Sequence, residues 1–179
     1  MGEVVTINKG CWHHVLTTVG EGGTLLELGS GETSQRFVNY GLKVYSIEHD
    51  PEWVGKYPGV NYIYAPLVRQ DEEDFHPYFL RMDCVPEWYD HTIVHNAIKD
   101  LKYDALLLDG PQRKYRPGFF YNHAMFDTSV PWFADDMNRP EWFRALLWTA
   151  VERGLDSFPE IHGVQTDHAW TVFPAQGGK

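Results

Sequence analysis

The sequence predicts a three-layer α/β/α domain with a mostly parallel seven-stranded sheet and an antiparallel last strand. Short apolar segments alternate with amphipathic segments, as expected for strands and helices of a parallel sheet. The links between the segments are short, and the length of 179 residues suits one ordinary domain. We therefore expect a single domain over residues 1–179, in which residues 1–22 form a helical cap or lid.

The first half of the chain contains three strand patterns and two helix patterns. The strands are expected at residues 24–28, 43–48 and 60–68. The first helix spans residues 33–40, with Thr33 or Ser34 near its N-cap and Gly41 at its end. Asp50 is suited to cap a second helix that starts at Pro51.

The second half begins with an irregular stretch, residues 69–86, whose acidic run at 71–74 is typical of solvated surface. Helices are expected at 88–101, 119–126 and 139–154, and strands at 104–109, 129–134, 161–164 and 169–173. In a parallel sheet with right-handed crossovers, the carboxyl ends of the strands share one edge. Ligands bind at that edge where the strand order reverses, so residues at the strand ends are the candidates for a site.

Glycines and a carboxylate stand at the ends of the first two predicted strands. Gly29-Ser30-Gly31 follows the first strand and permits a tight turn in which the backbone approaches a ligand. Glu48 ends the second strand, where a carboxylate can accept hydrogen bonds from a ribose diol. The alternative for Glu48 is a solvated acid or a helix cap, but Asp50 already suits the cap.

A nicotinamide dinucleotide would fit the same outline, but three features disfavour it. Ser34 replaces the third glycine of the dinucleotide motif, and Glu27 and Glu32 flank the turn where a pyrophosphate would lie. The strand ending at Asp109 continues as Gly-Pro. These carboxylates suit a cationic sulfonium with an amino-acid tail better than a dianion.

Three motifs carry a resemblance to a known family. They are the E-x-G-x-G run of residues 25–31, the S-I-E-H-D-P-E-W run of residues 46–53, and D-G-P-Q-R at residues 109–113. Together they resemble class I S-adenosylmethionine-dependent methyltransferases, especially small bacterial and glucuronoxylan-type O-methyltransferases. The resemblance spans about residues 24–136. It implies a Rossmann-like methyltransferase fold with S-adenosylmethionine as the cofactor.

The resemblance also implies roles for individual residues. Glu27 would hold the methionine ammonium, Glu48 the ribose hydroxyls, and His49 would lie near the adenine. Asp109 would face the transferred methyl group. The full set implied to contact the cofactor is Glu27, Gly29, Ser30, Gly31, Thr33, Ser34, Glu48, His49, Asp109 and Gly110.

Asp135 and Asp136 follow the fifth predicted strand, next to the strand that ends at Asp109. Adjacent strand ends lie about 5 Å apart, so the three carboxylates could hold Mg²⁺ or Mn²⁺. This resembles cation-dependent catechol-type O-methyltransferases, although Asp136 stands where that family has Asn. Alternatively, one of the pair caps the helix near residue 139 and the other acts as a base. Asp109, Asp135 and His123 are the catalytic candidates.

The acceptor site is expected around the loop that follows Asp109. Arg113 and Arg116 could clamp an acidic acceptor, with Tyr115 as a pocket wall. Arg113 could equally pair with Asp135 or Asp136. The sequence thus favours methylation of a hydroxyl on a small molecule or sugar. A protein that cleaves S-adenosylmethionine, or one that binds it without catalysis, remains an alternative.

Charge and composition exclude several partners. The formal net charge of −10 disfavours nucleic acid. No apolar run reaches the ~18 residues of a membrane span. The two cysteines, Cys11 and Cys84, lack metal or redox spacing and fit a reducing cytoplasm. The sequence carries no signal for an oligomeric state.

Overall fold

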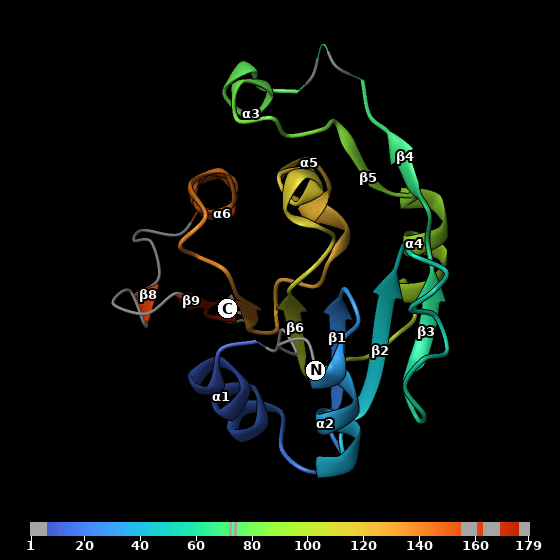
Figure 1. The fold of residues 1–179 in the computed structure, drawn as a ribbon. Helices are drawn as coiled ribbons and strands as arrows, with labels where there is room; N and C mark the ends of the chain where they lie inside the picture. Colours follow the sequence, from blue (N-terminus) through green and yellow to red (C-terminus); the bar gives the residue numbers. More distant parts are fainter. Residues whose placement is uncertain (1–6, 72, 74, 155–160, 163–168, 176–179) are drawn as a thin grey trace, which may run out of the picture.

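The computed structural model describes residues 7–71, 73, 75–154, 161–162 and 169–175. Its centre is a seven-stranded sheet with the order β3-β2-β1-β6-β7-β9-β8 (Figure 1). The strands are β1 (Thr24–Leu28), β2 (Lys43–Glu48), β3 (Asn61–Tyr64), β6 (Ala105–Leu108), β7 (Trp132–Ala134), β8 (Ile161–His162) and β9 (Trp170–Phe173). The first five in chain order run parallel, and β9 is antiparallel to β7 and β8. The predicted sheet and its antiparallel last strand are therefore confirmed.

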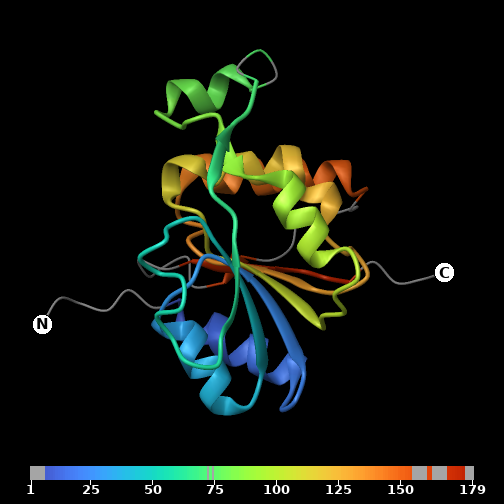
Figure 2. The ribbon, with the colours of Figure 1, turned by 90° about the vertical axis from the view of Figure 1, so that its right-hand side faces the viewer.

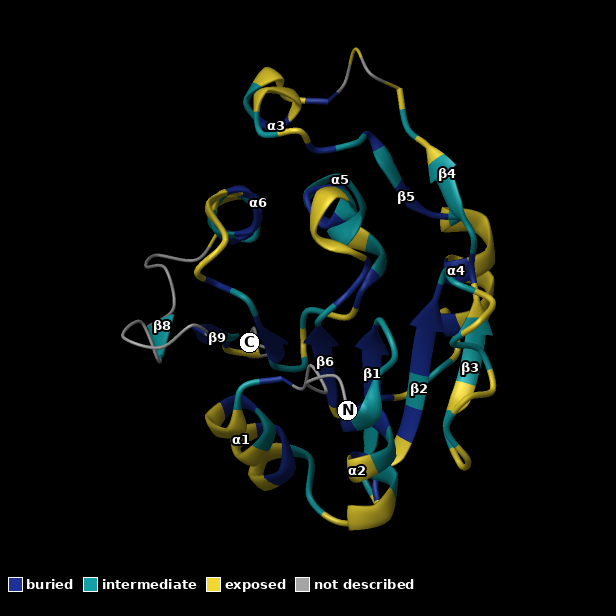
Figure 3. Cartoon of the chain, in the orientation of Figure 1, coloured by how far each residue is buried: buried dark blue, intermediate teal, exposed yellow. Residues whose placement is uncertain are grey.

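Helices cover both faces of the sheet. The helices α1 (Lys9–Val19) and α2 (Glu32–Tyr40) lie on one face (Figures 1 and 2). The other face carries α4 (His91–Ile98), α5 (Gly118–Asn122) and α6 (Pro140–Glu152). Figure 3 shows the central strands β1, β2 and β6 mostly buried between the two layers, while the outward sides of α1 and α2 are exposed. This is the three-layer arrangement that the sequence predicts.

The central strands bury side chains on both faces. Leu25 and Leu107 belong to the apolar cluster shared with α1 and α2. Leu26 and Leu106 belong to the larger cluster shared with α4, α5 and α6. Because both faces are covered, β1 and β6 read as near-continuous apolar runs rather than as alternating ones. Glu27 interrupts the run in β1, and it lies on the same face as Leu25.

Residues 1–22 were predicted to form a helical cap or lid; the helix is present as α1, and the lid role stays a prediction. Helix α1 packs on the sheet through fully buried Cys11 and Val15, as one element of the outer layer. Its N-cap is Asn8, whose side chain accepts hydrogen bonds from two backbone amides of the first turn. Residues 1–6 of the predicted lid lie outside the described residues.

The predicted third strand, residues 60–68, is interrupted at Ala65-Pro66. Only β3 belongs to the main sheet, while β4 (Leu67–Arg69) pairs with β5 (Glu87–Tyr89) in a separate antiparallel ribbon. Pro66 has no backbone N–H to continue the ladder of β3. The ribbon and α3 (Pro77–Arg81), which lies in the stretch predicted to be irregular, are on the outer side of α5 (Figures 1 and 2).

One predicted helix has a different start, and another is absent. The helix expected from residue 88 begins at His91, because Asp90 caps it by accepting from the amides of Thr92 and Ile93. The helix expected after Asp50 is wrong: residues 51–55 form turns instead. There the Asp50 side chain accepts from Glu52 N at 2.9 Å, which closes a local turn.

The remaining predictions agree with the structure. The short helix expected at 119–126 is present as α5 followed by η2 (His123–Met125), after a single turn η1 (Arg113–Tyr115). The predicted strand 161–164 is described for its first two residues, and the last two lie outside the described residues. Among the described residues, no helix is long and apolar enough to cross a membrane.

Candidate functional site

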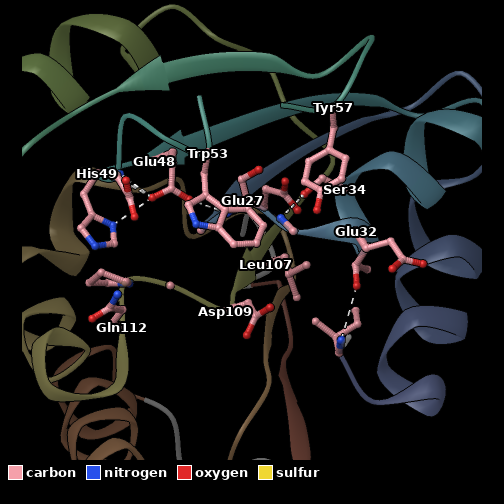
Figure 4. A pocket seen from close by; sticks show the side chains of 18 of the residues that line it. Glu27, Glu32, Ser34, Glu48, His49, Trp53, Tyr57, Leu107, Asp109 and Gln112 are labelled. Carbon is pink, nitrogen blue, oxygen red and sulfur yellow. Dashed lines mark hydrogen bonds and ion pairs between the residues drawn. The ribbon is translucent and has the colours of Figure 1, made fainter. Parts of the chain in front are cut away.

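A cavity of about 620 Å³ opens at the carboxyl ends of β1, β2 and β6 (Figure 4). Its position matches the point where the strand order reverses, since β2 and β6 lie on opposite sides of β1. All ten residues that the sequence assigns to the cofactor line this cavity: Glu27, Gly29, Ser30, Gly31, Thr33, Ser34, Glu48, His49, Asp109 and Gly110. The structure thus brings the whole set together.

Two glycines hold the loops after β1 and β6 in contact. Gly29 has a left-handed φ of 84°, and a Cβ on it would stand 2.9 Å from Gly110 Cα. A Cβ on Gly110 would stand 2.6 Å from Gly29 Cα. No side chain fits at either position without moving the backbone.

Gly31 has a different reason to be glycine. Its φ of −159° is ordinary extended backbone, and a Cβ there would meet no atom within 4 Å. Gly31 lines the cavity. Protein packing therefore does not require glycine at this position, and the missing side chain leaves room for a ligand.

Glu48 is a buried carboxylate held by backbone amides. Its Oε1 accepts from His49 N at 2.7 Å and from Asp50 N at 2.9 Å, and its Oε2 accepts from Ser30 N at 2.9 Å. Burial alone would raise the pKa of Glu48, but these bonds and the His49 side chain outweigh it and lower the pKa. Oε2 accepts only this one bond from the described residues and keeps acceptor capacity for a hydroxyl.

Glu27 is the opposite kind of carboxylate. It is 2% exposed, and its Oε1 has no hydrogen-bond partner among the described residues. Burial raises the pKa of Glu27 to about 8, and the hydroxyls of Ser34 and Ser46 offset only part of that shift. The cavity therefore contains a buried acceptor that lacks a donor or a cation.

Aromatic side chains that were not predicted from the sequence form one wall of the cavity. Trp53, Lys56 and Tyr57 line it, and the Trp53 and Tyr57 side chains point toward the space beside Glu48 and Glu27 (Figure 4). The Lys56 ammonium lies 3.4 Å from the Trp53 ring centroid. Trp53 belongs to the motif at residues 46–53, but a helix starting at Pro51 was expected there, so the direction of these side chains was not predicted.

Arg116 lines the cavity, but most of its side chain is buried. It is 7% exposed, and its Nε donates to Pro111 O at 3.0 Å. Nη1 donates to Asp136 Oδ2 at 2.8 Å, and Nη2 donates to Asp109 Oδ1 at 3.1 Å and also to Asp109 O. These bonds engage its donors within the protein, and the expectation that Arg116 clamps an acidic acceptor stays a prediction.

The prediction that Asp109, Asp135 and Asp136 together hold a metal ion is wrong. No group of three or more His, Cys, Asp or Glu side chains in the described part of the chain is arranged to hold a metal ion. Arg116 bonds to Asp109 and Asp136, while Asp135 Oδ2 accepts from Asn8 N at 3.1 Å. The alternative, in which an aspartate caps α6, is not seen either, since the N-cap of α6 is Arg139 without a side-chain bond.

Asp109 and Asp135 are nevertheless unusual acids. The partly buried position of Asp109 raises its pKa, an effect that Arg116 opposes and the neighbouring aspartates increase. Burial likewise raises the pKa of Asp135, and the charge of Asp136 adds to this effect. Only Asp109 lines the cavity, so it is the one of the two that can exchange a proton with a bound acceptor.

The other predicted site residues lie away from the cavity lining. The His123 ring packs on Phe120, and its Nδ1 lies 2.6 Å from Phe120 O. Arg113 pairs with buried Glu141 rather than with Asp135 or Asp136. Tyr115 contacts the edge of the His49 ring, with centroids 6.3 Å apart, so it supports a lining residue from behind.

The comparisons with known proteins agree on the architecture. No protein-family model matches the sequence, and no curated protein sequence matches it. A TehB-like SAM-dependent methyltransferase from Corynebacterium glutamicum superposes with a TM-score of 0.52 and 15% identity, over 93% of this chain and 88% of that one. A precorrin-6y C5,15-methyltransferase from Geobacter metallireducens gives 0.54 and 11%, over 96% and 90%. The chain has the Rossmann-like methyltransferase fold. At such identities the likeness establishes the fold alone.

The Arg113–Glu141 pair gives a prediction about stability. Arg113→Ala is expected to lower the free energy of unfolding by about 2 kcal/mol, because it leaves the buried Glu141 carboxylate without its cation. Thermal and urea denaturation at pH 7 measure the change. The double variant Arg113→Ala/Glu141→Gln is the control and should recover part of the loss. An unchanged stability would show that Glu141 does not depend on Arg113.

Proposed function

We propose that this protein is an S-adenosylmethionine-dependent methyltransferase whose cavity at the carboxyl edge binds the cofactor. The observation that carries the proposal is the unpartnered, buried Glu27 oxygen in the same cavity as Glu48 and the open space at Gly31. A ligand with a cationic amino-acid end and a ribose end satisfies both carboxylates at once. A dianionic pyrophosphate would instead meet two buried acids.

Different residues around the cavity are suited to bind different parts of the ligand. Glu27 is suited to the methionine ammonium, and Glu48 to a ribose hydroxyl through Oε2. His49 and Trp53 lie on the side of the cavity next to Glu48 and suit the flat adenine (Figure 4). When bound, the cofactor would supply a methyl group on a sulfonium sulfur that leaves as a neutral thioether.

We further propose that the acceptor is a hydroxyl of a small molecule or sugar. Such an oxygen must lose its proton as it bonds to the methyl carbon, and Asp109, which lines the cavity and whose pKa is raised above the usual value of an aspartate, is suited to accept that proton. Arg116 is engaged with two aspartates and Arg113 with Glu141. These two arginines therefore do not favour an anionic acceptor, and a neutral hydroxyl fits the site better.

Calorimetry with S-adenosylhomocysteine at pH 8 tests the cofactor. We expect binding with a dissociation constant in the micromolar range. No heat at millimolar ligand would end the proposal. Incubation with S-adenosylmethionine alone tests a cofactor-cleaving activity, because breakdown without any acceptor would replace methyl transfer as the function.

Gly31→Thr separates the ligand site from the fold. Threonine is an accepted N-cap residue, and nothing in the protein lies within 4 Å of the new Cβ. We therefore expect a melting temperature within a few degrees of the wild type. The side chain would occupy ligand space, so the affinity for S-adenosylhomocysteine should fall by at least about tenfold.

Gly110→Ala is the matched contrast to Gly31→Thr. Its Cβ would stand 2.6 Å from the Gly29 backbone, so this variant should lose stability as well as binding. A Gly31→Thr protein that binds as well as the wild type would show that the ligand does not occupy the space at Gly31.

A further inference from the structure

Arg116 is the centre of a closed set of contacts at the carboxyl ends of β6 and β7. Its guanidinium bonds to carboxylates from both strand ends, Asp109 after β6 at 3.1 Å and Asp136 after β7 at 2.8 Å. The Nε–H of Arg116 donates to Pro111 O at 3.0 Å. An arginine fork with partners on three sides is fixed in position, unlike a surface arginine.

The guanidinium stands where a divalent cation would need to bind. Mg²⁺ and Mn²⁺ require carboxylate oxygens that converge on one point about 2 Å away. Here the oxygens that could converge, Asp109 Oδ1 and Asp136 Oδ2, point at Nη2 and Nη1 of Arg116. Two cations cannot share these oxygens without strong repulsion.

The backbone of Asp136 provides an independent observation. Asp136 has φ of 58°, in the left-handed region that residues other than glycine seldom adopt. Asp83 is the other non-glycine residue with positive φ in the described part of the chain. With this backbone conformation the Asp136 carboxylate accepts from Arg116, while Oδ2 of the neighbouring Asp135 accepts from Asn8 N. Such conformations persist where surrounding contacts determine them.

We propose that Arg116 is the resident cation of this site and takes the place of a divalent metal ion. Its guanidinium neutralises the carboxylates at two adjacent strand ends and holds Asp109 at the cavity wall, so it is a positioning residue. The role of Arg116 in methyl transfer rests on the proposed function. The test of metal binding does not depend on that function. With Arg116 in place, the site does not need Mg²⁺ or Mn²⁺. Removal of the guanidinium would leave the carboxylate oxygens of Asp109 and Asp136 free to bind such an ion.

Titration of the purified protein with Mn²⁺, followed by electron paramagnetic resonance of the free ion, tests this inference. Wild type is expected to bind no Mn²⁺ at the site at submillimolar concentrations. Arg116→Met keeps the aliphatic stem but removes the charge, so it should bind Mn²⁺ at least about tenfold more tightly than wild type. Arg116→Lys retains a cation and should remain without the site.

Arg116→Met/Asp136→Asn is the matched control, and it should lose the Mn²⁺ binding gained by Arg116→Met. Tight wild-type binding that Asp136→Asn removes would overturn the proposal, as would an Arg116→Met protein that is folded by circular dichroism and gains no Mn²⁺. If Arg116→Met does not fold, the wild-type and Asp136→Asn titrations decide. Calorimetry of wild type with S-adenosylhomocysteine separates a failure of the proposed function from a failure of this inference.

Discussion

Glu27→Gln is expected to raise the free energy of unfolding at pH 8 and at the same time to weaken S-adenosylhomocysteine binding. Burial raises the pKa of Glu27 from 4.5 to about 8, so the folded protein resists the charge that the unfolded chain carries freely. A neutral glutamine of the same shape removes this conflict. The gain should be on the order of 3 kcal/mol at pH 8, measured by urea denaturation.

The sign of the pH dependence follows from the same shift. A carboxyl whose folded pKa is raised binds more protons in the folded state, so its contribution to stability is complete below about pH 4.5 and is lost as pH rises toward 8. The wild-type stability should therefore fall across that window relative to Glu27→Gln. Equal slopes for the two proteins would contradict the raised pKa.

Ligand binding should respond in the opposite direction. The methionine ammonium needs the ionised carboxylate, so the wild-type affinity should rise between pH 6 and 8, by at most about tenfold per pH unit. Glu27→Gln should lose this dependence and about 10- to 100-fold in affinity, the loss of one charge-assisted hydrogen bond.

Glu32→Gln is the matched control for Glu27→Gln. Glu32 lines the same cavity, but its side chain is 35% exposed and pairs with Arg36 on the helix surface. Surface ion pairs of this kind contribute little to stability. The free energy of unfolding and the affinity for S-adenosylhomocysteine should therefore both stay close to the wild-type values. If Glu27→Gln binds as tightly as Glu32→Gln, then Glu27 does not contact the ligand.

The parts of the fold that the sequence predicted are those set by local physics. The short apolar runs at residues 24–28 and 104–109 form strands β1 and β6, as expected. The failures have specific causes. Pro66 divides a continuous apolar run into strands of two different sheets, and an apolar run alone does not contain that information. Asp50 and Pro51 are as typical of a turn as of a helix start, so the pair does not distinguish the two.

The candidate site shows the same division. The cofactor residues were predictable because each stands at the end of a parallel strand, and the fold places those ends together. The partner of Arg116 was not predictable from spacing, because the left-handed backbone at Asp136 decides which aspartate it meets. Trp53 was in the matched motif, yet its orientation depended on the turn that replaced the expected helix.

Glu48→Gln is expected to act on stability in the opposite direction to Glu27→Gln. Three backbone amides donate to the Glu48 carboxylate. In glutamine, one carboxylate oxygen is replaced by an NH2 group, so at least one backbone N–H would face another donor. The free energy of unfolding at pH 7 should fall by about 2–3 kcal/mol. S-adenosylhomocysteine binding should also weaken, because the Ser30 turn and the ribose acceptor are both affected.

The pH dependence distinguishes the two acids. The hydrogen bonds that outweigh burial lower the pKa of Glu48 below 4.5, so its contribution to stability is complete above that value and is lost as pH falls through the folded pKa. The deficit of Glu48→Gln should therefore shrink in acid, whereas the advantage of Glu27→Gln should appear only as pH rises. One cavity thus holds an acid that the protein itself keeps charged and another that only a bound cation would keep charged. Parallel pH profiles for the two variants would contradict this division, and with it the assignment of the ribose to Glu48 and of the ammonium to Glu27.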